Sequence, residues 1–517
     1  MKRLKKILLT GIACCFYVSG LFAGGLLTNT NQSVHFLRNP ARTASFEIDA
    51  VYTNPAGLAY LPTNGFYFSL NNQSAFQTRT ITSTAASFAL NGGSDTKAFK
   101  GKATAPVIPS LMGAYKTDRW VFSFDVGIIG GGGTLTFDKG LPSFESQVSA
   151  PVAQLSGAAK IPTTYSLDSK LEGSSIIYGV QLGATYQIND HFSAFIGGRA
   201  SFVDNGYVGY LKNVSLSAAS DMTTYFNTAA AGAHGVSASL QPAIDGGMGA
   251  LPISNLGLPA AQLAQMAGAL GISEAQLGAM TVSTVQSTFN SVATQAEGAA
   301  AGVGQLTSTN LELDSKQSGS GIAPILGFNF NFDKLNIGVK YEFKTALTIE
   351  NKTTKDNTGM FTDGEKTPYD IPAILTVGAQ YEIVPSVSIS AGYNHFFDSD
   401  AKMQNGKQQY INGGINEFLL GAEWKINKMF LISAGGLITR TGVTDNYQSD
   451  MNFNLNSVTF GFGGAVNLSE SVRINAGYLF TNYEDWTKNA TSSESVISKD
   501  IFSRTNKAFG IGVDFRF

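Results

Sequence analysis

Apolar residues alternate with small or polar residues along many segments of this chain, with the period of two that is typical of β-strands. In the last segment one face is bulky and apolar while the other is small or charged, and the apolar positions are Phe509, Ile511, Val513, Phe515 and Phe517. One such strand fits either a soluble sheet or a membrane barrel, whose apolar face meets lipid. A series of strands is needed to separate these two folds.

The same pattern predicts a series of strands at residues 64–78, 103–117, 119–137, 174–188, 192–212, 319–332, 335–350, 370–383, 387–398, 414–426, 429–442, 453–467, 472–482 and 507–517. The connections alternate between short turns and long loops, the long loops being 79–102, 138–173, 213–318, 351–369, 399–413, 443–452 and 483–506. Short periplasmic turns alternating with long external loops are typical of outer-membrane barrels. We therefore expect an all-β fold, a transmembrane antiparallel β-barrel of about 14 strands formed by residues 64–517.

The N-terminus has the features of a secretory signal peptide, which we expect at residues 1–23. A mainly apolar run at 7–22 ends at Ala23 and follows four basic residues, Lys2, Arg3, Lys5 and Lys6. The alternative is a retained anchor helix, for which the run is short. No later apolar run reaches the roughly 18 residues of a membrane helix, so an exported membrane protein of this sequence would be a closed barrel.

Composition agrees with an exported barrel. Charged residues make up 14% of the chain, which also has 57 glycines and 35 phenylalanines. Without the signal peptide the chain keeps 31 basic residues (35 less four) against 37 acidic ones, a net charge of −6 that argues against nucleic-acid binding. Cys14 and Cys15 both lie in the signal, so the mature chain would have no thiol ligand. We predict no cofactor and no metal; Asp398-Ser399-Asp400 is interpreted as a solvated turn, with external Ca²⁺ as the alternative.

Two segments do not follow the strand pattern. Residues 24–63 precede the first strand, and we predict that they hang in the periplasm or fold into the lumen as a plug, for which a barrel of this size has room. Residues 213–318 form a long external insertion, in which Leu263, Met266 and Leu270 follow helical spacing and Ser273 begins a capping-box pattern. These helices would either form an apolar groove that gathers ligand or only cap the barrel rim.

One short motif resembles a known family. Residues 49–61 contain Asn54-Pro55-Ala56-Gly57 and are similar to the plug, or hatch, signature of the FadL/TodX family of outer-membrane hydrophobic-compound transporters. The motif follows a signal peptide and precedes a series of strands that ends in Phe517. The resemblance implies passive transport of hydrophobic small molecules, such as long-chain fatty acids. Ligand would pass from an external apolar groove to a lumen pocket gated by the hatch, and leave sideways beside a kinked third strand.

The resemblance also suggests residues for these roles. The third predicted strand contains Gly130-Gly131-Gly132-Gly133, which would form the kink of the lateral opening, although a flexible strand end is the alternative. A ligand carboxylate inside the lumen would favour a cation, and Arg199 and Lys340 are the candidates for that headgroup contact. The alternative is that these cations pair with wall carboxylates or hold the hatch.

Other functions compete with transport. An outer-membrane lipase needs a histidine–serine pair, and His191-Phe192-Ser193 falls at a predicted periplasmic turn, so we predict that the protein is not an enzyme. A general porin would lack the plug, while a surface adhesin or structural barrel would use the insertion for recognition. The expected location is the Gram-negative outer membrane. The expected partners are a hydrophobic ligand, membrane lipid and, through Phe517, the barrel-assembly machinery.

Overall fold

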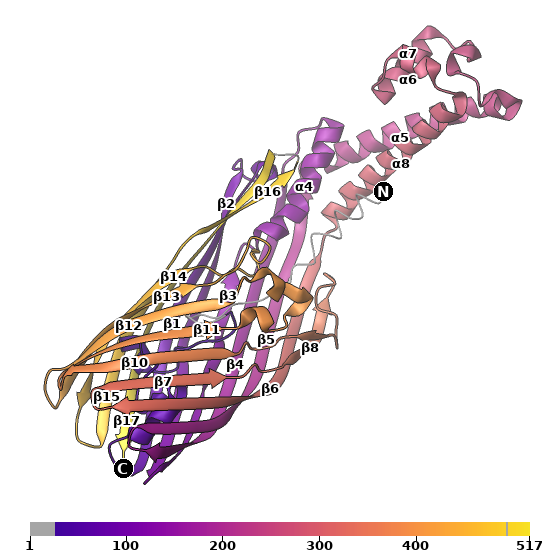
Figure 1. Cartoon of the computed structure of the whole chain (residues 1–517). Helices are drawn as coiled ribbons and strands as arrows, with labels where there is room; N and C mark the ends of the chain where they lie inside the picture. Colours follow the sequence, from indigo (N-terminus) through magenta and orange to yellow (C-terminus); the bar gives the residue numbers. More distant parts are fainter. Residues whose placement is uncertain (1–25, 493–494) are drawn as a thin grey trace.

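A computed structural model describes residues 26–492 and 495–517 of the chain (Figure 1). The predicted signal peptide lies outside the described residues. The strand segments are β1 (Gly65–Ala85), β2 (Thr96–Thr117), β3 (Trp120–Phe137), β4 (Tyr165–Asn189), β5 (Phe192–Leu216), β6 (Leu311–Phe332), β7 (Leu335–Glu342), β8 (Thr348–Asp356), β9 (Lys366–Pro368), β10 (Ile374–Val384), β11 (Val387–Phe396), β12 (Ile415–Lys425), β13 (Phe430–Arg440), β14 (Ser457–Asn467), β15 (Val472–Tyr483), β16 (Trp486–Ser492) and β17 (Ser495–Arg516).

These segments form one closed antiparallel barrel. Three barrel strands are each interrupted once, as β7 with β8, β9 with β10, and β15 with β16, so the 17 segments in the sheet make 14 strands around the wall. β17 pairs with β1 along most of its length and closes the ring. The predicted fold class and strand number are thus confirmed.

The outer wall carries the apolar side chains. Large hydrophobic residues on alternate strand positions are exposed, for example Phe509 at 49% and Ile511 at 62%. Aromatic side chains gather near the short turns, as in the stack of Trp120 on Phe122, which is typical of the interfacial girdles of membrane barrels. Among the described residues, no helix has the length and hydropathy needed to cross a membrane.

Several strands extend farther at their external ends than the alternation of apolar residues predicts. β1 continues to Ala85 and β2 begins at Thr96, so most of the predicted loop 79–102 is strand; β17 begins at Ser495, inside the predicted loop 483–506. The outward positions of this part of β1 are threonines, Thr78 to Thr84 on alternate residues. Threonine favours strands but gives no apolar signal, and for this reason the prediction ended too early.

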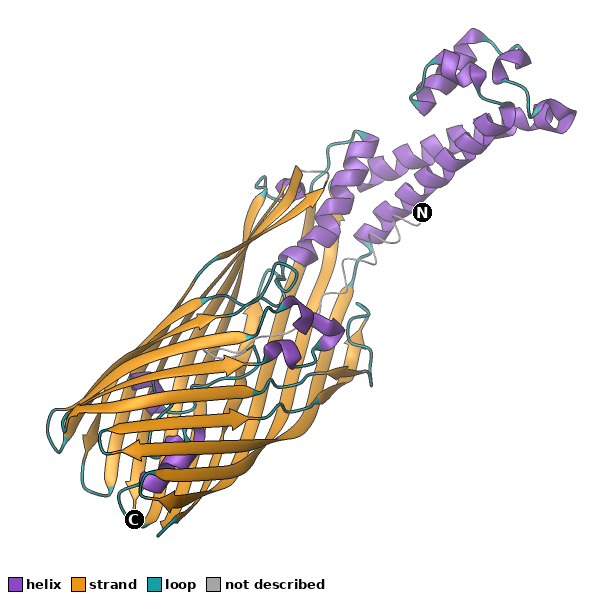
Figure 2. Ribbon diagram, in the orientation of Figure 1, coloured by secondary structure: helices purple, strands orange, loops and turns teal. Residues whose placement is uncertain are grey.

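The N-terminal segment fills the inside of the barrel. It contains α2 (Val34–Arg38), α3 (Ala50–Thr53) and the 3₁₀ helix η1 (Pro55–Tyr60), and almost all its residues are buried. Figure 2 shows these short helices enclosed by the strands. The wall makes room for them with inward glycines: a Cβ at Gly378 would come within 2.0 Å of Thr43 Oγ1. We call residues 26–61 the plug.

Helices cover and extend the external end of the barrel. α4 (Pro142–Ala159) lies at the rim, while α5 (Ala219–Ala243) and α8 (Val282–Thr307) form a helical hairpin that projects away from it (Figure 1). The hairpin carries a small distal cluster with α6 (Ala260–Leu270), α7 (Glu274–Ala279) and the short turns η3 (Ile244–Met248) and η4 (Ile253–Leu256). The predicted capping box at Ser273 is present. The remaining short helices, η2 (Ala86–Leu90), η5 (Asp398–Asp400) and η6 (Gln404–Tyr410), lie in external loops.

Candidate ligand pathway and plug contacts

Arginines fix the central part of the plug to the barrel wall. Within the plug, Arg42 binds Asp49 through two hydrogen bonds of 2.7 Å and also contacts Glu47 at 2.7 Å. Burial by itself raises the pKa of the Asp49 carboxyl, but the Arg42 guanidinium outweighs it and lowers that pKa overall. From the wall, Arg473 reaches Glu47 at 2.6 Å, while plug residue Arg38 reaches out to Glu423 at 2.5 Å. The plug is therefore held to the wall by a buried ion pair on β12 and a partly buried one on β15.

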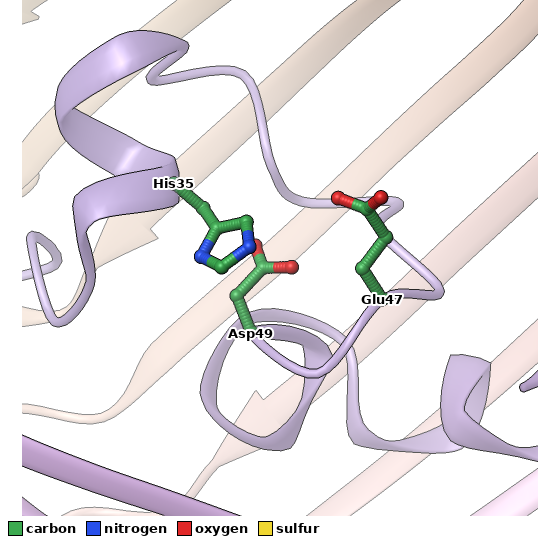
Figure 3. Close-up of side chains that lie close together, drawn as sticks. All are labelled: His35, Glu47 and Asp49. Atoms are coloured by element: carbon green, nitrogen blue, oxygen red, sulfur yellow. The ribbon is translucent and has the colours of Figure 1, made fainter. Parts of the chain in front are cut away.

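Figure 3 shows His35, Glu47 and Asp49 close together, and one ligand atom of each lies within 4.8 Å of the others. Three such residues can in principle bind a cation. In this plug, however, both carboxylates form ion pairs with Arg42, and His35 Nε2 lies 3.1 Å from the Asp514 carboxylate of the wall. We interpret the cluster as structural and assign no metal to it.

The motif at residues 54–57 contacts the wall on another side. The Asn54 amide donates to Asn329 Oδ1 at 2.7 Å and to the Ser45 carbonyl at 2.9 Å. Gly57 lies so near that carbonyl that a Cβ there would approach it to 2.6 Å. Strand hydroxyls donate to the next two carbonyls, those of Pro55 and Ala56, at 2.8 and 2.7 Å. The motif thus satisfies the backbone of the plug where it turns towards the first strand.

Arg199 and Lys340, the predicted headgroup contacts, both lie against the plug. Arg199 is fully buried, pairs with Glu342 at 2.5 Å and lies 4.7 Å from the ring centre of Tyr52. Lys340 Nζ donates to the Tyr52 carbonyl at 2.8 Å and lies 4.5 Å from the same ring. These contacts fit the alternative in which the cations hold the hatch; contact with a headgroup remains a prediction.

The glycine run lies inside β3, where it interrupts the wall. The register between β3 and β4 shifts on either side of Gly130 and Gly131, and the latter has a φ of +67°. On the other side, β2 and β3 pair at Thr104 with Thr134 and next at Leu111 with Val126, so residues 105–110 and 127–133 form no ladder with each other. The run is therefore a kink within the strand, next to a gap in β2–β3 pairing, and the alternative of a flexible strand end does not describe it.

The start of the plug bonds to the edges of this gap. Asn29 N–H donates to the Ile129 carbonyl at 2.7 Å, and the Gln32 amide donates to the Ile128 carbonyl at 2.9 Å. On the β2 side, the Ser110 hydroxyl donates to the Gln32 carbonyl at 2.6 Å. Unpaired strand backbone is costly in a membrane, so residues 26–32 replace part of the missing ladder. We call residues 26–32 the gate segment.

Leu263, Met266 and Leu270 do not line an open groove. Met266 is 2% exposed, and the other two pack beside it in the small core of the distal helical cluster. An apolar pocket occurs instead at the barrel rim. Its lining has no charged residue and consists of Ser143, Phe144, Gln147, Leu171, Gly209, Tyr210, Leu211, Leu311, Leu313, Thr358, Met360 and Met451. We call it the rim pocket.

Two buried arginines lie in segments that the sequence assigned to loops. Arg79 of β1 is directly opposite Arg504 of β17, and both side chains are turned into the barrel. Aromatic rings surround them: Arg79 lies 5.1 Å from the ring centre of Phe453, and Arg504 lies 4.7 Å from that of Tyr483. Strand alternation predicts the pair once β1 is extended through its threonine-rich end and β17 through its polar end at residues 495–506.

The histidines give no support to an enzyme. In the described chain their partners are Asp514 for His35, the Asn331 carbonyl for His191, Glu297 for His234 and Asn416 for His395. None of these four contacts is a serine hydroxyl, so no histidine–serine pair is formed there. The His191-Phe192-Ser193 sequence lies at the short turn between β4 and β5, as predicted.

A closed barrel with an apolar outer belt and an internal plug defines the protein as a plugged Gram-negative outer-membrane β-barrel. No family model matches its sequence, and no curated protein matches it either. Its structure is similar to that of a Pseudomonas aeruginosa FadL homologue, with a TM-score of 0.57 and 10% identity over 96% of this chain and 100% of that one. It is also similar to the Pseudomonas putida toluene transporter TodX, with a TM-score of 0.50 and 15% identity over 96% and 100% of the two chains. At such identities the similarity establishes the fold, which is that of the FadL and TodX barrels.

Proposed function

We propose that this protein is a passive channel that moves hydrophobic small molecules from outside the cell through the outer membrane. The observation that carries the proposal is the β2–β3 gap, a break in an otherwise paired wall that the gate segment fills. A barrel that only supported the membrane or a helical hairpin would gain nothing from unpaired backbone at this depth. The fold shared with a FadL homologue and a toluene transporter supports the same function.

The rim pocket is the proposed entry site. Leu171, Leu211 and Leu313 form part of its wall, and Met360 and Met451 provide flexible apolar contacts. Asp450 accepts a hydrogen bond from the Ser143 backbone at 2.7 Å, which fixes the start of α4 over the pocket. An uncharged lining of this kind would bind an acyl chain or aromatic ring by burial of apolar surface.

The Arg79–Arg504 pair is the proposed contact for an acidic headgroup. Two guanidinium groups side by side in aromatic surroundings form a strong binding site for a carboxylate, because each hydrogen bond is charge-assisted and water is largely excluded. We therefore propose long-chain fatty acids as ligands, with the headgroup at Arg79 and Arg504. In this proposal Arg199 and Lys340 position the plug through Tyr52 and do not bind ligand.

The β2–β3 gap is the proposed exit into the membrane. The gate segment would have to leave the edges of the gap for a ligand to pass, which breaks the bonds of Asn29 and Gln32 to β3. Asn72 and Ser74 of β1 bind the irregular part of β2 through the Ile108 N–H and the Pro106 carbonyl, at 3.1 and 2.6 Å. These bonds would keep the β2 edge in place while the gate segment moves.

The test is uptake of labelled oleate by cells that lack their own fatty-acid channel and express this protein. The double variant Arg79→Gln/Arg504→Gln should lower oleate uptake by at least about 100-fold, because two charge-assisted bonds are lost and each is worth about 1.5–3 kcal/mol, while toluene uptake stays unchanged. Arg440→Gln, at an external arginine that is 46% exposed, is the control. Equal oleate uptake by the folded double variant would reject the headgroup site, and no uptake of either compound by wild type would reject transport.

A second experiment tests the exit. The only cysteines of the chain are Cys14 and Cys15, so a single engineered thiol in the barrel can be labelled selectively. Val107→Cys places it beside the gap at a side chain that is 67% exposed, and Leu182→Cys places the control on the paired wall at 62%. A bulky maleimide at position 107 should reduce uptake several-fold and one at position 182 should not. Equal uptake after both labels would show that ligand leaves by another path.

The projecting helical hairpin favours a second function, surface recognition. Residues 219–307 contain no lysine or arginine and extend well beyond the rim (Figure 1). Deletion of residues 225–300 with a short linker would separate the two functions: transport should persist if the hairpin serves recognition alone. Loss of uptake with an intact barrel would instead make the hairpin part of ligand capture.

A further inference from the structure

A group of exposed lysines lies on the outer wall where β17, β1 and β2 run side by side. Lys102 is directly opposite Thr78, Lys100 is opposite Thr80, and Lys507 is opposite Phe76. All three lysine side chains face outward and are exposed. Lys100 and Lys102 are two residues apart on one strand, which places them about 7 Å from each other. We call Lys100, Lys102 and Lys507 the lysine patch.

The lysine patch carries positive charge that neighbouring acids do not balance. No ion pair, hydrogen bond or ring contact of these three ammonium groups occurs in the described part of the chain. Two acids on the neighbouring strands towards β4 and β15, Glu172 and Glu484, each have their own cation, Lys170 at 3.6 Å and Arg440 at 3.2 Å, and Asp485 follows Glu484. Asp138 follows the end of β3 near Lys100, forms no ion pair with it and is followed by Lys139.

The other lysine-rich face of the barrel is different. On β6 and β8, Lys355 pairs with Glu312, while Lys316 and Lys352 lie opposite each other between Asp314 and Glu350. There the charges alternate in sign, as on an ordinary solvated surface. The excess of positive charge is thus a feature of the β17–β1–β2 face, not of external strand ends in general.

The apolar belt on the periplasmic side of the lysine patch shows where the patch lies along the membrane normal. The outward positions of β17 are apolar from Phe517 up to Phe509, and the next one is Lys507. Phe76 stacks on Phe509 at 6.1 Å between ring centres and marks the upper edge of the belt on β1. Nine strand residues at the usual tilt correspond to about 25 Å of membrane thickness. The patch therefore lies at the level of the headgroups of the outer leaflet.

Hydroxyl groups surround the ammonium groups. Thr78 lies between Lys102 and Thr505, and Thr80 lies between Lys100 and Ser503 in the strand register. Lysines and hydroxyls together donate well to the oxygens of a phosphate, and the phenylalanines beneath them suit acyl chains. We propose that the lysine patch binds a phosphorylated acylated glycolipid of the outer leaflet, of the lipid A type, with phosphate on the lysines and acyl chains on Phe76, Phe509 and Ile511.

The experiment measures lipid binding to the detergent-purified full-length barrel by native mass spectrometry. The probes are bis-phosphorylated lipid A, the same lipid after removal of its phosphates, and inorganic phosphate. We expect tight binding of the phosphorylated lipid, weaker binding at high salt, and at least about 10-fold weaker binding by the variant Lys100→Gln/Lys102→Gln/Lys507→Gln. The matched control, Lys316→Gln/Lys352→Gln/Lys355→Gln, removes the same charge from the other face and should bind within about 2-fold of wild type.

Unchanged lipid binding by the lysine-patch variant, or equal loss in the control variant, would overturn the proposal. So would equal affinity for the dephosphorylated lipid, because the phosphate contact would then be absent. Complete displacement of the lipid by inorganic phosphate at similar concentration would show a simple anion site and would reject the lipid. If the triple variant does not fold, Lys102→Gln/Lys507→Gln applies the same test. The readout is independent of transport, so a failure here does not affect the proposed channel.

Discussion

The two parts of the plug are held in different ways. Residues 38–61, which we call the anchored half, are bound by the arginine network of Arg38, Arg42 and Arg473 and by the Asn54 motif. The gate segment has no ion pair among the described residues and is attached to the gap by backbone and amide hydrogen bonds. Buried ion pairs are costly to break, whereas single hydrogen bonds contribute about 1 kcal/mol each. The proposed channel therefore predicts that the gate segment moves first while the anchored half stays in place.

The largest expected effect comes from Arg42→Gln. Asp49 is fully buried and would lose its bidentate partner, which costs about 3–5 kcal/mol. The anchored half should then lose its internal ion-pair network and loosen, while Arg38 and Arg473 still bind across to the wall. Hydrogen exchange of residues 38–61 should rise strongly, and conductance in planar bilayers should increase. The exposed Arg440→Gln serves as control and should change neither quantity. Unchanged exchange in Arg42→Gln would remove the distinction between the two parts.

A matched pair of glycine substitutions sharpens the comparison. A Cβ at Gly378 would lie 2.0 Å from Thr43 Oγ1 in the anchored half, and one at Gly130 would lie 2.0 Å from the Leu27 carbonyl in the gate segment. Overpacking of this kind costs about 1–3 kcal/mol. Gly378→Ala should lower the thermal stability of the plug with little change in conductance. Gly130→Ala should displace the gate segment and raise conductance. The reverse outcome would contradict the assignment of the mobile part.

The gate segment should also respond to pH through Asp398, which lies in an external loop. This carboxyl is fully buried, so the interpretation of residues 398–400 as a solvated turn is wrong for Asp398. Burial raises the pKa of this carboxyl to about 7, although the N–H groups of Ile415 and Leu26 bind it and Glu417 lies near. Because the folded pKa lies above the ordinary value of about 4, the protonated form stabilises the folded loop. The folded loop is therefore stabilised as pH falls through 7, and it loses this stabilisation as pH rises through 7.

Hydrogen exchange measured at pH 6 and pH 8, and corrected for intrinsic rates, tests this dependence. Residues 26–28 and 398–401 should exchange faster at pH 8 than at pH 6. In Asp398→Asn the difference should disappear, since the amide stays neutral at both values. A pH dependence that persists in this variant would assign it to another group.

The smallest effect is expected for Gln32→Leu. The substitution removes the amide bonds to the carbonyls of Asn29 and Ile128 and costs about 0.5–1.5 kcal/mol for each bond. Exchange at residues 26–32 should rise several-fold, while residues 38–61 remain protected. Equal change in both parts would mean that the plug unfolds as one unit.

Some features of the protein follow from the sequence alone. The period-two alternation and the short turns predict a closed barrel of the right strand number, because each apolar position must face lipid. The length of residues 24–63 and the Asn54-Pro55-Ala56-Gly57 motif point to a plug, and Gly130–Gly133 points to an irregular third strand. These features depend on the order of residues within short segments, and the sequence shows that order directly.

Other features were decided only by the tertiary structure. Alternation shows which face a residue occupies but not which residue lies opposite, and the register alone brings Arg79 to Arg504 and leaves residues 105–110 of β2 without partners on β3. In the same way, alternation turns Arg199 and Lys340 towards the lumen, but only the folded plug places Tyr52 against both of them. Leu263, Met266 and Leu270 have helical spacing in either a groove or a core, and the packing of the distal helices places them in a core. Contacts between distant segments depend on strand register and on the path of the plug, and local patterns do not contain that information.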